Sequence, residues 1–83
     1  MVNKVIVEGY LKEWFTPRTG VLWIRLATDN YFFLVDVPKE LTKQIGRKRR
    51  GLHMVVAGKL QPPESNSPIV IAEKVEVIDE ERN

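Results

Sequence analysis

The stretch YFFLVDVPKELTKQIGRKRRG, residues 31–51, contains the pattern that decides the fold. Its first part, Tyr31–Val37, is an aromatic and β-branched run with the length of one strand. The next part, Pro38–Ile45, predicts a short helix, because proline is tolerated in a first helical turn and because Leu41 and Ile45 are four residues apart on one face. Gly46 is placed to cap this helix, so a single short helix follows the strand.

Two alternating strands precede this stretch. Val5–Glu13 alternates with period two, which is typical of a strand with one buried face. One face carries Val5, Val7, Gly9 and Leu11, and the other carries Ile6, Glu8, Tyr10 and Lys12. Val21–Thr28 alternates in the same way, with Leu22, Ile24 and Leu26 inward and Val21, Trp23, Arg25 and Ala27 outward. Turn residues at 16–20 separate these strands, and Asp29-Asn30 is a two-residue hairpin connection to the third.

Two further strands, Leu52–Leu60 and Pro68–Ile78, follow the helix and are joined by an exposed loop, Gln61–Pro68. Gly9 and Gly58 indicate bulges or tight bends, and the last strand leaves room for a bulge near Glu73. The order β-β-β-α-β-β predicts an all-β protein, a five-stranded OB-fold barrel with one short helix between strands 3 and 4. We expect residues 1–78 to form this domain and residues 79–83 to form a charged tail.

The third strand is apolar on both faces, so its orientation is ambiguous. One face carries Tyr31, Phe33, Val35 and Val37, and the other carries Phe32, Leu34 and Asp36. We place Phe32 in the core and Tyr31 and Phe33 on the outward face. The opposite hypothesis, in which Tyr31 and Phe33 belong to the barrel core, stays open.

Composition favours a binding module over an enzyme. A chain of 83 residues has room for one domain. It has no cysteine and one histidine, His53, which we expect to be structural, so we expect no disulfide framework, zinc site, cofactor or catalytic triad. The first residues lack the apolar core of a signal peptide, and no apolar run approaches the roughly 20 residues of a membrane span. We therefore expect a cytoplasmic protein.

Charge is unevenly placed along the chain. The formal net charge is +2, but residues 1–72 carry 11 basic and 6 acidic side chains, whereas residues 73–83 are acidic on balance. A basic body is typical of proteins that bind polyanions. The alternative is a solvated surface with a charged tail.

Several motifs together resemble those of the bacterial single-stranded DNA-binding proteins. NKVIVEG at 3–9 resembles their opening, and IRLAT at 24–28 resembles the end of their second strand. FTPRTGV at 15–21 resembles their aromatic-Thr-Pro-x-Gly loop with one extra residue. GLHMVVAGKLQ at 51–61 is similar to their fourth strand. The resemblance covers nearly the whole chain and implies an OB-fold that binds single-stranded DNA without sequence specificity.

The chain also departs from that family. Asp29-Asn30 replaces a long hairpin, the loop between the last two strands has no aromatic residue, and the sequence shows neither the linker nor the acidic tip that recruits partners. A short form of this kind is similar to primosomal replication proteins of the PriB type. The segment EKVEVID at 73–79 also resembles the C-terminus of those proteins. This resemblance implies a bacterial homodimer in DNA replication or replication restart, which bridges a restart helicase to helicase-loading proteins.

Several functions remain open at this point. Motifs do not separate a minimal single-stranded DNA-binding protein from a PriB-like primosome adaptor. An OB module that binds only proteins is a further alternative. RNA binding is another, because base stacking barely distinguishes the two sugars.

A single-strand groove needs flat faces for bases and cations for phosphates. Trp23 and Arg25 alternate on the outward face of the second strand, which places a stacking platform about 7 Å from a phosphate donor. Tyr31 takes the position of the family's stacking tryptophan, because its interval to Gly51 fits. Trp14 and Phe15, expected in the first loop, are candidates to clamp a base. Each aromatic has a structural alternative: the core, a loop staple or a dimer interface.

Basic candidates lie mainly between the helix and the fourth strand. By resemblance, Arg50 and Lys39 take the family's phosphate-binding positions. The complete set of expected phosphate contacts is Lys12, Arg18, Arg25, Lys39, Arg47, Lys48, Arg49, Arg50 and Lys59. The alternative for residues 47–50 is a solvated turn.

A homodimer interface is expected on the first strand. Its outward face carries Ile6, Glu8 and Tyr10, two of which are apolar. An 83-residue barrel is close to the lower limit of self-sufficiency, and the related proteins pair through this strand.

Overall fold

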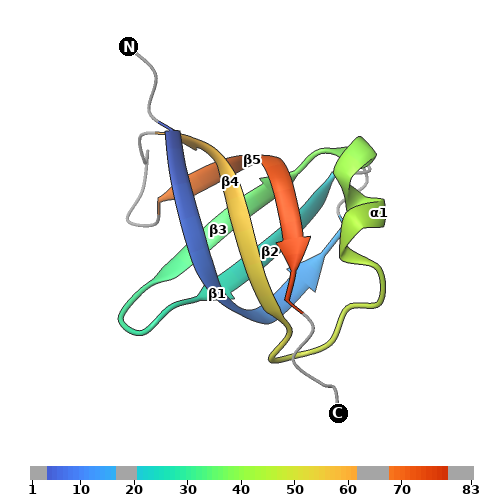
Figure 1. The fold of residues 1–83 in the computed structure, drawn as a ribbon, viewed down its shortest axis with the longest axis horizontal. Helices are drawn as coiled ribbons and strands as arrows, with labels where there is room; N and C mark the ends of the chain where they lie inside the picture. Colours follow the sequence, from blue (N-terminus) through green and yellow to red (C-terminus); the bar gives the residue numbers. More distant parts are fainter. Residues whose placement is uncertain (1–3, 17–20, 62–67, 79–83) are drawn as a thin grey trace.

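The computed structural model describes residues 4–16, 21–61 and 68–78. Five strands form a closed barrel in the order β1-β2-β3-β5-β4, with β3 and β5 parallel and the other pairs antiparallel (Figure 1). The strands are β1 (Lys4–Phe15), β2 (Leu22–Ala27), β3 (Phe32–Val37), β4 (His53–Gln61) and β5 (Ile69–Val77). A 3₁₀ turn, η1 (Lys39–Leu41), and a one-turn helix, α1 (Thr42–Ile45), lie between β3 and β4. The predicted architecture is therefore confirmed.

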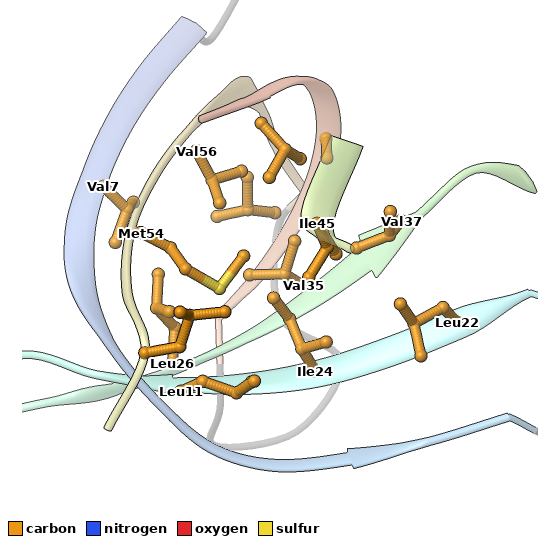
Figure 2. Packing of buried hydrophobic residues seen from close by; sticks show 14 residues of the cluster. Val7, Leu11, Leu22, Ile24, Leu26, Val35, Val37, Ile45, Met54 and Val56 are labelled. Atoms are coloured by element: carbon orange, nitrogen blue, oxygen red, sulfur yellow. The ribbon is translucent and has the colours of Figure 1, made fainter. Parts of the chain in front are cut away.

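The barrel interior is filled by the inward positions of all five strands (Figure 2). Leu22, Ile24 and Leu26 are almost fully buried, as the alternation of the second strand predicts. Val7 and Leu11 of β1 meet them from the neighbouring strand. Among the described residues no polar or charged side chain is buried, so burial of apolar surface is what holds the barrel together.

Strand β1 bends so that its two halves pair with different neighbours. Residues Lys4–Tyr10 pair with β4, and residues Tyr10–Phe15 pair with β2. Gly9 lies where the two pairings meet, and a Cβ built on it would lie 2.4 Å from the carbonyl oxygen of Ala27. Glycine is therefore required by the close approach of β2, in agreement with the bend that the sequence predicts.

The predicted bulge near Glu73 is also confirmed. Ala57 of β4 pairs with Lys74 and Gly58 with Ala72, so Glu73 has no partner in the register. A Cβ on Gly58 would lie 2.1 Å from the carbonyl oxygen of Ile71. The bulge lets β5 curve closely over β4 at this glycine.

The face assigned to Phe32 and Phe33 in the third strand was wrong. Val35 and Val37 are fully buried, and Phe33 packs against the core with them. Phe32 is 53% exposed and lies on the outward face. The register of the β2–β3 hairpin explains this result: Ala27 faces Phe32 and Leu26 faces Phe33, and directly opposite residues share a face of a sheet.

The segment between β3 and β4 closes one end of the barrel (Figure 1). Ile45 is buried in the core and Leu41 packs against it, as the four-residue spacing predicts. The expected single helix is instead a 3₁₀ turn followed by α1. Gly46 ends it with a φ of 68°, a conformation that favours glycine.

Some predictions differ in detail or lie outside the described residues. Trp14 and Phe15 belong to β1 and not to a loop. Of the turn at 16–20, residues 17–20 are outside the described ranges, as are residues 62–67 of the loop and the tail at 79–83. Within the described ranges, no helix is long and apolar enough to cross a membrane.

Candidate nucleic-acid interface

The outward face of β1 and β2 gathers aromatic and basic side chains. Phe15 lies directly opposite Trp23, and Glu13 lies opposite Arg25. Phe15 is half exposed and Trp23 is half-buried. The Nη1 atom of Arg25 lies 3.6 Å from Oε1 of Glu13, and both side chains remain about half accessible. The outward positions of Trp23 and Arg25 agree with the sequence prediction.

Phe32 joins this face from β3. Its ring centroid lies 5.9 Å from Cζ of Arg25, which is within the range of a cation–π contact. The sequence prediction missed Phe32 because it placed this ring in the core. Two signals in the sequence could have found it. Asp36 shares the face of Phe32 and favours solvent, and a two-residue hairpin sets Ala27 opposite Phe32.

We name the outward set Phe15, Trp23, Arg25 and Phe32 the aromatic face. Its rings are separated by one cation, so bases could stack on the rings while Arg25 meets a phosphate. Both kinds of contact that a single-strand groove requires are thus present on β1, β2 and β3.

Asp36 continues this face toward β5. It lies opposite Trp23 on one side and Ile71 on the other. Partial burial raises the pKa of the Asp36 carboxyl group above its ordinary value. The aromatic face therefore carries one acidic group at its edge.

Tyr31 and Phe33 do not form the exposed pair that the sequence predicted. Tyr31 precedes β3 and is 65% exposed, whereas Phe33 packs against the core. Their ring centroids are 6.5 Å apart and tilted by 57°. Tyr31 remains a candidate for stacking, and Phe33 is better explained as a core residue that supports it.

A second cluster lies where the basic loop meets β1. Gly51 N–H donates a hydrogen bond to the Leu11 carbonyl, and Leu11 N–H donates one to the Leu52 carbonyl, each at 2.8 Å. These bonds bring Arg50 beside Lys12, and the two residues line one shallow hollow with Glu13 and Trp14. We call this hollow the basic rim.

The rest of the basic loop extends from this rim. Arg47, Arg49 and Arg50 are exposed and Lys48 is half-buried. Lys39 is exposed and begins η1 on the other side of α1. The structure thus brings Lys12, Trp14 and Arg50 together in one hollow, and Lys39 is not among the residues that line this hollow.

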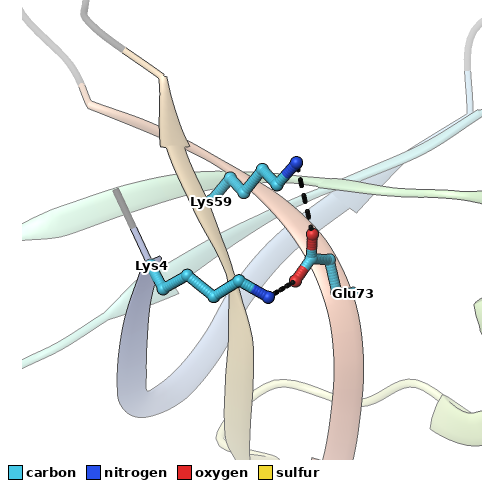
Figure 3. Close-up of polar contacts among 3 residues, drawn as sticks. All are labelled: Lys4, Lys59 and Glu73. Atoms are coloured by element: carbon cyan, nitrogen blue, oxygen red, sulfur yellow. Dashed lines mark hydrogen bonds and ion pairs between the residues drawn. The ribbon is translucent and has the colours of Figure 1, made fainter. Parts of the chain in front are cut away.

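Lys59 has an acidic neighbour. Its Nζ lies 3.9 Å from Oε2 of Glu73, and Nζ of Lys4 lies 3.1 Å from Oε1 of the same carboxylate (Figure 3). Both lysines are more than half exposed. Glu73 offsets part of their charge, which makes Lys59 a weaker candidate for phosphate than Arg49 or Arg50.

The predicted dimer residues share one outer face of β1. Ile6 is 75% exposed and Tyr10 is 46% exposed. The Tyr10 ring stacks on His53 at 4.8 Å, and Nε2 of His53 lies 2.6 Å from Oε2 of Glu8. His53 is therefore engaged in contacts on this outer face, as expected of a structural residue.

Two points concern a predicted phosphate contact, Arg18, and possible metal sites. Arg18 lies outside the described residues. In the part of the chain that the structure describes, no group of three histidine, cysteine, aspartate or glutamate residues could hold a metal ion.

No protein-family model matches this sequence, and no curated protein sequence matches it. Among solved structures, the barrel is similar to part of an asparaginyl-tRNA synthetase from Entamoeba histolytica, which was solved in complex with asparaginyl-adenylate. That match has a TM-score of 0.74 and 17% identity, and it covers 99% of this chain and 22% of the synthetase. This chain therefore spans about a fifth of that enzyme.

A second similar structure is the dimeric N-terminal domain of the PriB protein from Thermoanaerobacter tencongensis. It matches with a TM-score of 0.63 and 16% identity, over 94% of this chain and 98% of that one. Identities this low show the fold alone. Together with the closed barrel and its strand order, they establish that the chain is a five-stranded OB-fold barrel.

Proposed function

We propose that this protein binds single-stranded nucleic acid without overall sequence specificity, and without catalysis. The observation that carries the proposal is the aromatic face, where Arg25 lies between exposed rings on adjacent strands. The exposure of a group of aromatic side chains to water is unfavourable. Such groups are common at sites where a ligand covers them. OB-folds bind oligonucleotides on the corresponding strands.

In the proposed mechanism, one cluster of residues binds the bases and another binds the phosphates. Rings of the aromatic face stack on bases, and each stacked base contributes about 1–3 kcal/mol. The basic rim and the exposed arginines of residues 47–50 meet phosphates, and this interaction gains free energy by releasing counterions. Because every base has a flat face, such contacts tolerate any sequence.

We propose DNA as the ligand, and replication or replication restart as the setting. The motif resemblance to single-stranded DNA-binding proteins and the structural similarity to a PriB domain support this choice. A PriB-like adaptor would also bind replication-restart helicase or helicase-loading proteins. RNA binding and pure protein binding are the competing functions.

We also propose that two copies associate through β1. Residues Lys4–Gly9 pair with β4 on one edge, and the other edge has no strand partner among the described residues. Ile6 protrudes beside hollows lined by Val5, Ala57 and Val55. The similar PriB domain was solved as a dimer. An unpaired strand edge flanked by apolar side chains favours pairing with a second copy.

The decisive experiment is a titration with poly-dT, poly-rU and duplex DNA at several salt concentrations. With about 3–5 phosphate contacts, the log–log slope for a single strand is expected between roughly −2 and −3.5. Tighter binding of poly-dT than of duplex supports the proposal, and tighter binding of poly-rU favours the RNA alternative. If the protein binds none of the three, the protein-binding alternative remains.

A further inference from the structure

Asp36 occupies an unusual position on the outside of the barrel. The cross-strand registers place five side chains in one row, one from each strand, in the order Phe15, Trp23, Asp36, Ile71 and Lys59. Directly opposite side chains of an antiparallel pair, such as Trp23 and Asp36, lie about 4.5–5.5 Å apart at Cβ. The carboxylate is therefore flanked by an indole on one side and an isoleucine on the other.

No structural role in the described part of the chain accounts for this carboxylate. Asp36 has no hydrogen bond and no ion pair to another described residue. The two residues beside it in β3, Val35 and Val37, are fully buried, so its own backbone is fixed. The carboxylate is therefore a half-buried acceptor without a protein partner among the described residues, and it is open to a donor that a ligand brings to the outer face of the barrel. The raised pKa of Asp36 reflects the same partial burial.

We infer that Asp36 reads the edge of a base stacked at Trp23 and that it selects guanine at this one position. The inference rests on the proposed binding of single-stranded nucleic acid. Guanine presents two neighbouring donors, N1–H and the N2 amino group, on its Watson–Crick edge. A carboxylate accepts such a pair through both oxygens, in the same geometry as it accepts an arginine.

The other bases fit this acceptor less well. The amino groups of adenine and cytosine each stand beside a ring nitrogen that is itself an acceptor, so a carboxylate gains one bond and meets one repulsion. Thymine and uracil offer a single N–H between two carbonyl groups. Single-stranded bases are commonly stacked on aromatic side chains and hydrogen-bonded on this edge, so the arrangement has a general basis.

The test compares short dT oligonucleotides, about eight nucleotides long, that carry one central dG, inosine, dC or dA. Affinities are measured by anisotropy of a dye on the oligonucleotide, at one fixed salt concentration, for the wild type and Asp36→Asn. Asp29→Asn is the matched control, because it removes the same charge from an exposed residue outside the row. We expect the dG oligonucleotide to bind the wild type about five- to tenfold more tightly than dT alone, the lower part of the range for one bidentate pair.

Inosine isolates the contact without any change to the protein. It keeps N1–H but lacks the N2 amino group, so it should lose most of the dG preference. Asp36→Asn should abolish the preference, and Asp29→Asn should retain it. Melting curves of both variants verify that the barrel remains folded.

Each other outcome overturns the inference. Equal affinity of the wild type for all oligonucleotides would remove the specificity but leave the proposed function intact. A uniform gain in affinity of Asp36→Asn for every sequence would show that Asp36 only repels phosphate. An unchanged dG preference in that variant would place the selection elsewhere. If the wild type binds none of the oligonucleotides, the proposed function fails, and this inference fails with it.

Discussion

The guanidinium of Arg25 lies over the ring of Phe32, with Cζ 5.9 Å from the ring centroid. The two residues come from β2 and β3, and both lie on the outside of the barrel. The contact orients a cation and a ring together, so that one nucleotide could meet both: its base on Phe32 and its phosphate on Arg25. This pair, rather than the predicted pair of Tyr31 and Phe33, is the centre of the aromatic face.

Phe32→Ala should weaken poly-dT binding by about 1–3 kcal/mol, because one stacking platform is lost. The salt slope should stay nearly the same, because no phosphate contact is removed. Fluorescence titrations at several salt concentrations measure both quantities. Phe33→Ala is the control: it should cost up to about 3 kcal/mol of unfolding free energy, because Phe33 packs against the core. Normal binding by a folded Phe32→Ala variant would exclude this ring from the interface.

Arg49→Ala and Arg50→Ala should each reduce the magnitude of the salt slope by about 0.7, since each removes one phosphate contact. Lys59→Ala should change the slope less, because Glu73 lies 3.9 Å from the Lys59 ammonium group. The measurement is the same titration with poly-dT. Equal slopes for all three variants and the wild type would show that the phosphates follow another path.

Asp36→Asn should stabilise the folded protein at pH 7. Burial raises the pKa of this carboxyl group in the folded state, so its ionised form is less favourable there than in the unfolded chain. Its contribution to stability is therefore fully present below the unfolded value near 4 and is lost as the pH rises through the folded pKa. Melting temperatures of the variant and the wild type should differ at pH 7 and converge in acid. A variant that is less stable at pH 7 would mean that the carboxylate has a stabilising partner.

Much of the barrel could be predicted because most strands alternate between apolar residues that face the core and polar residues that face solvent. In the second strand, Leu22, Ile24 and Leu26 alternate with Trp23 and Arg25, and only one register buries the leucines. The third strand could not be oriented from its own residues, because both faces are apolar. The turn settles it, since a two-residue connection places Ala27 opposite Phe32.

The candidate site was predicted less completely, because it depends on contacts between distant segments. Arg50 reaches Lys12 and Trp14 only because the backbone of Gly51 bonds to Leu11, 40 residues earlier in the chain. The neighbours of Asp36 depend on the parallel pairing of β3 with β5, which local sequence does not specify. The types of side chain were therefore predictable, but several of their groupings were not.

Ile6→Glu should convert the proposed dimer to a monomer without unfolding it. Ile6 is 75% exposed in the single chain, so a charge there costs little until two copies meet. Sedimentation at micromolar concentration measures the change in mass. Ile71→Glu is the matched control, because it places the same charge on an exposed isoleucine of β5, outside the proposed β1 interface, and should leave the dimer intact. A wild type that sediments as a monomer would contradict the β1 interface.

Gly58→Ala should destabilise the barrel far more than Gly51→Ala. An added Cβ at Gly58 would lie 2.1 Å from the Ile71 carbonyl oxygen, and relief requires the backbone of β5 to move at the Glu73 bulge. We expect a loss of at least about 3 kcal/mol in unfolding free energy, measured by urea denaturation. At Gly51 a Cβ meets open space, and only the φ of 86° is unfavourable, at about 1–2 kcal/mol. Similar losses for the two variants would mean that β5 can move away from β4 at little cost. The row that places Asp36 and Ile71 beside Trp23 would then lack the rigidity that base selection requires.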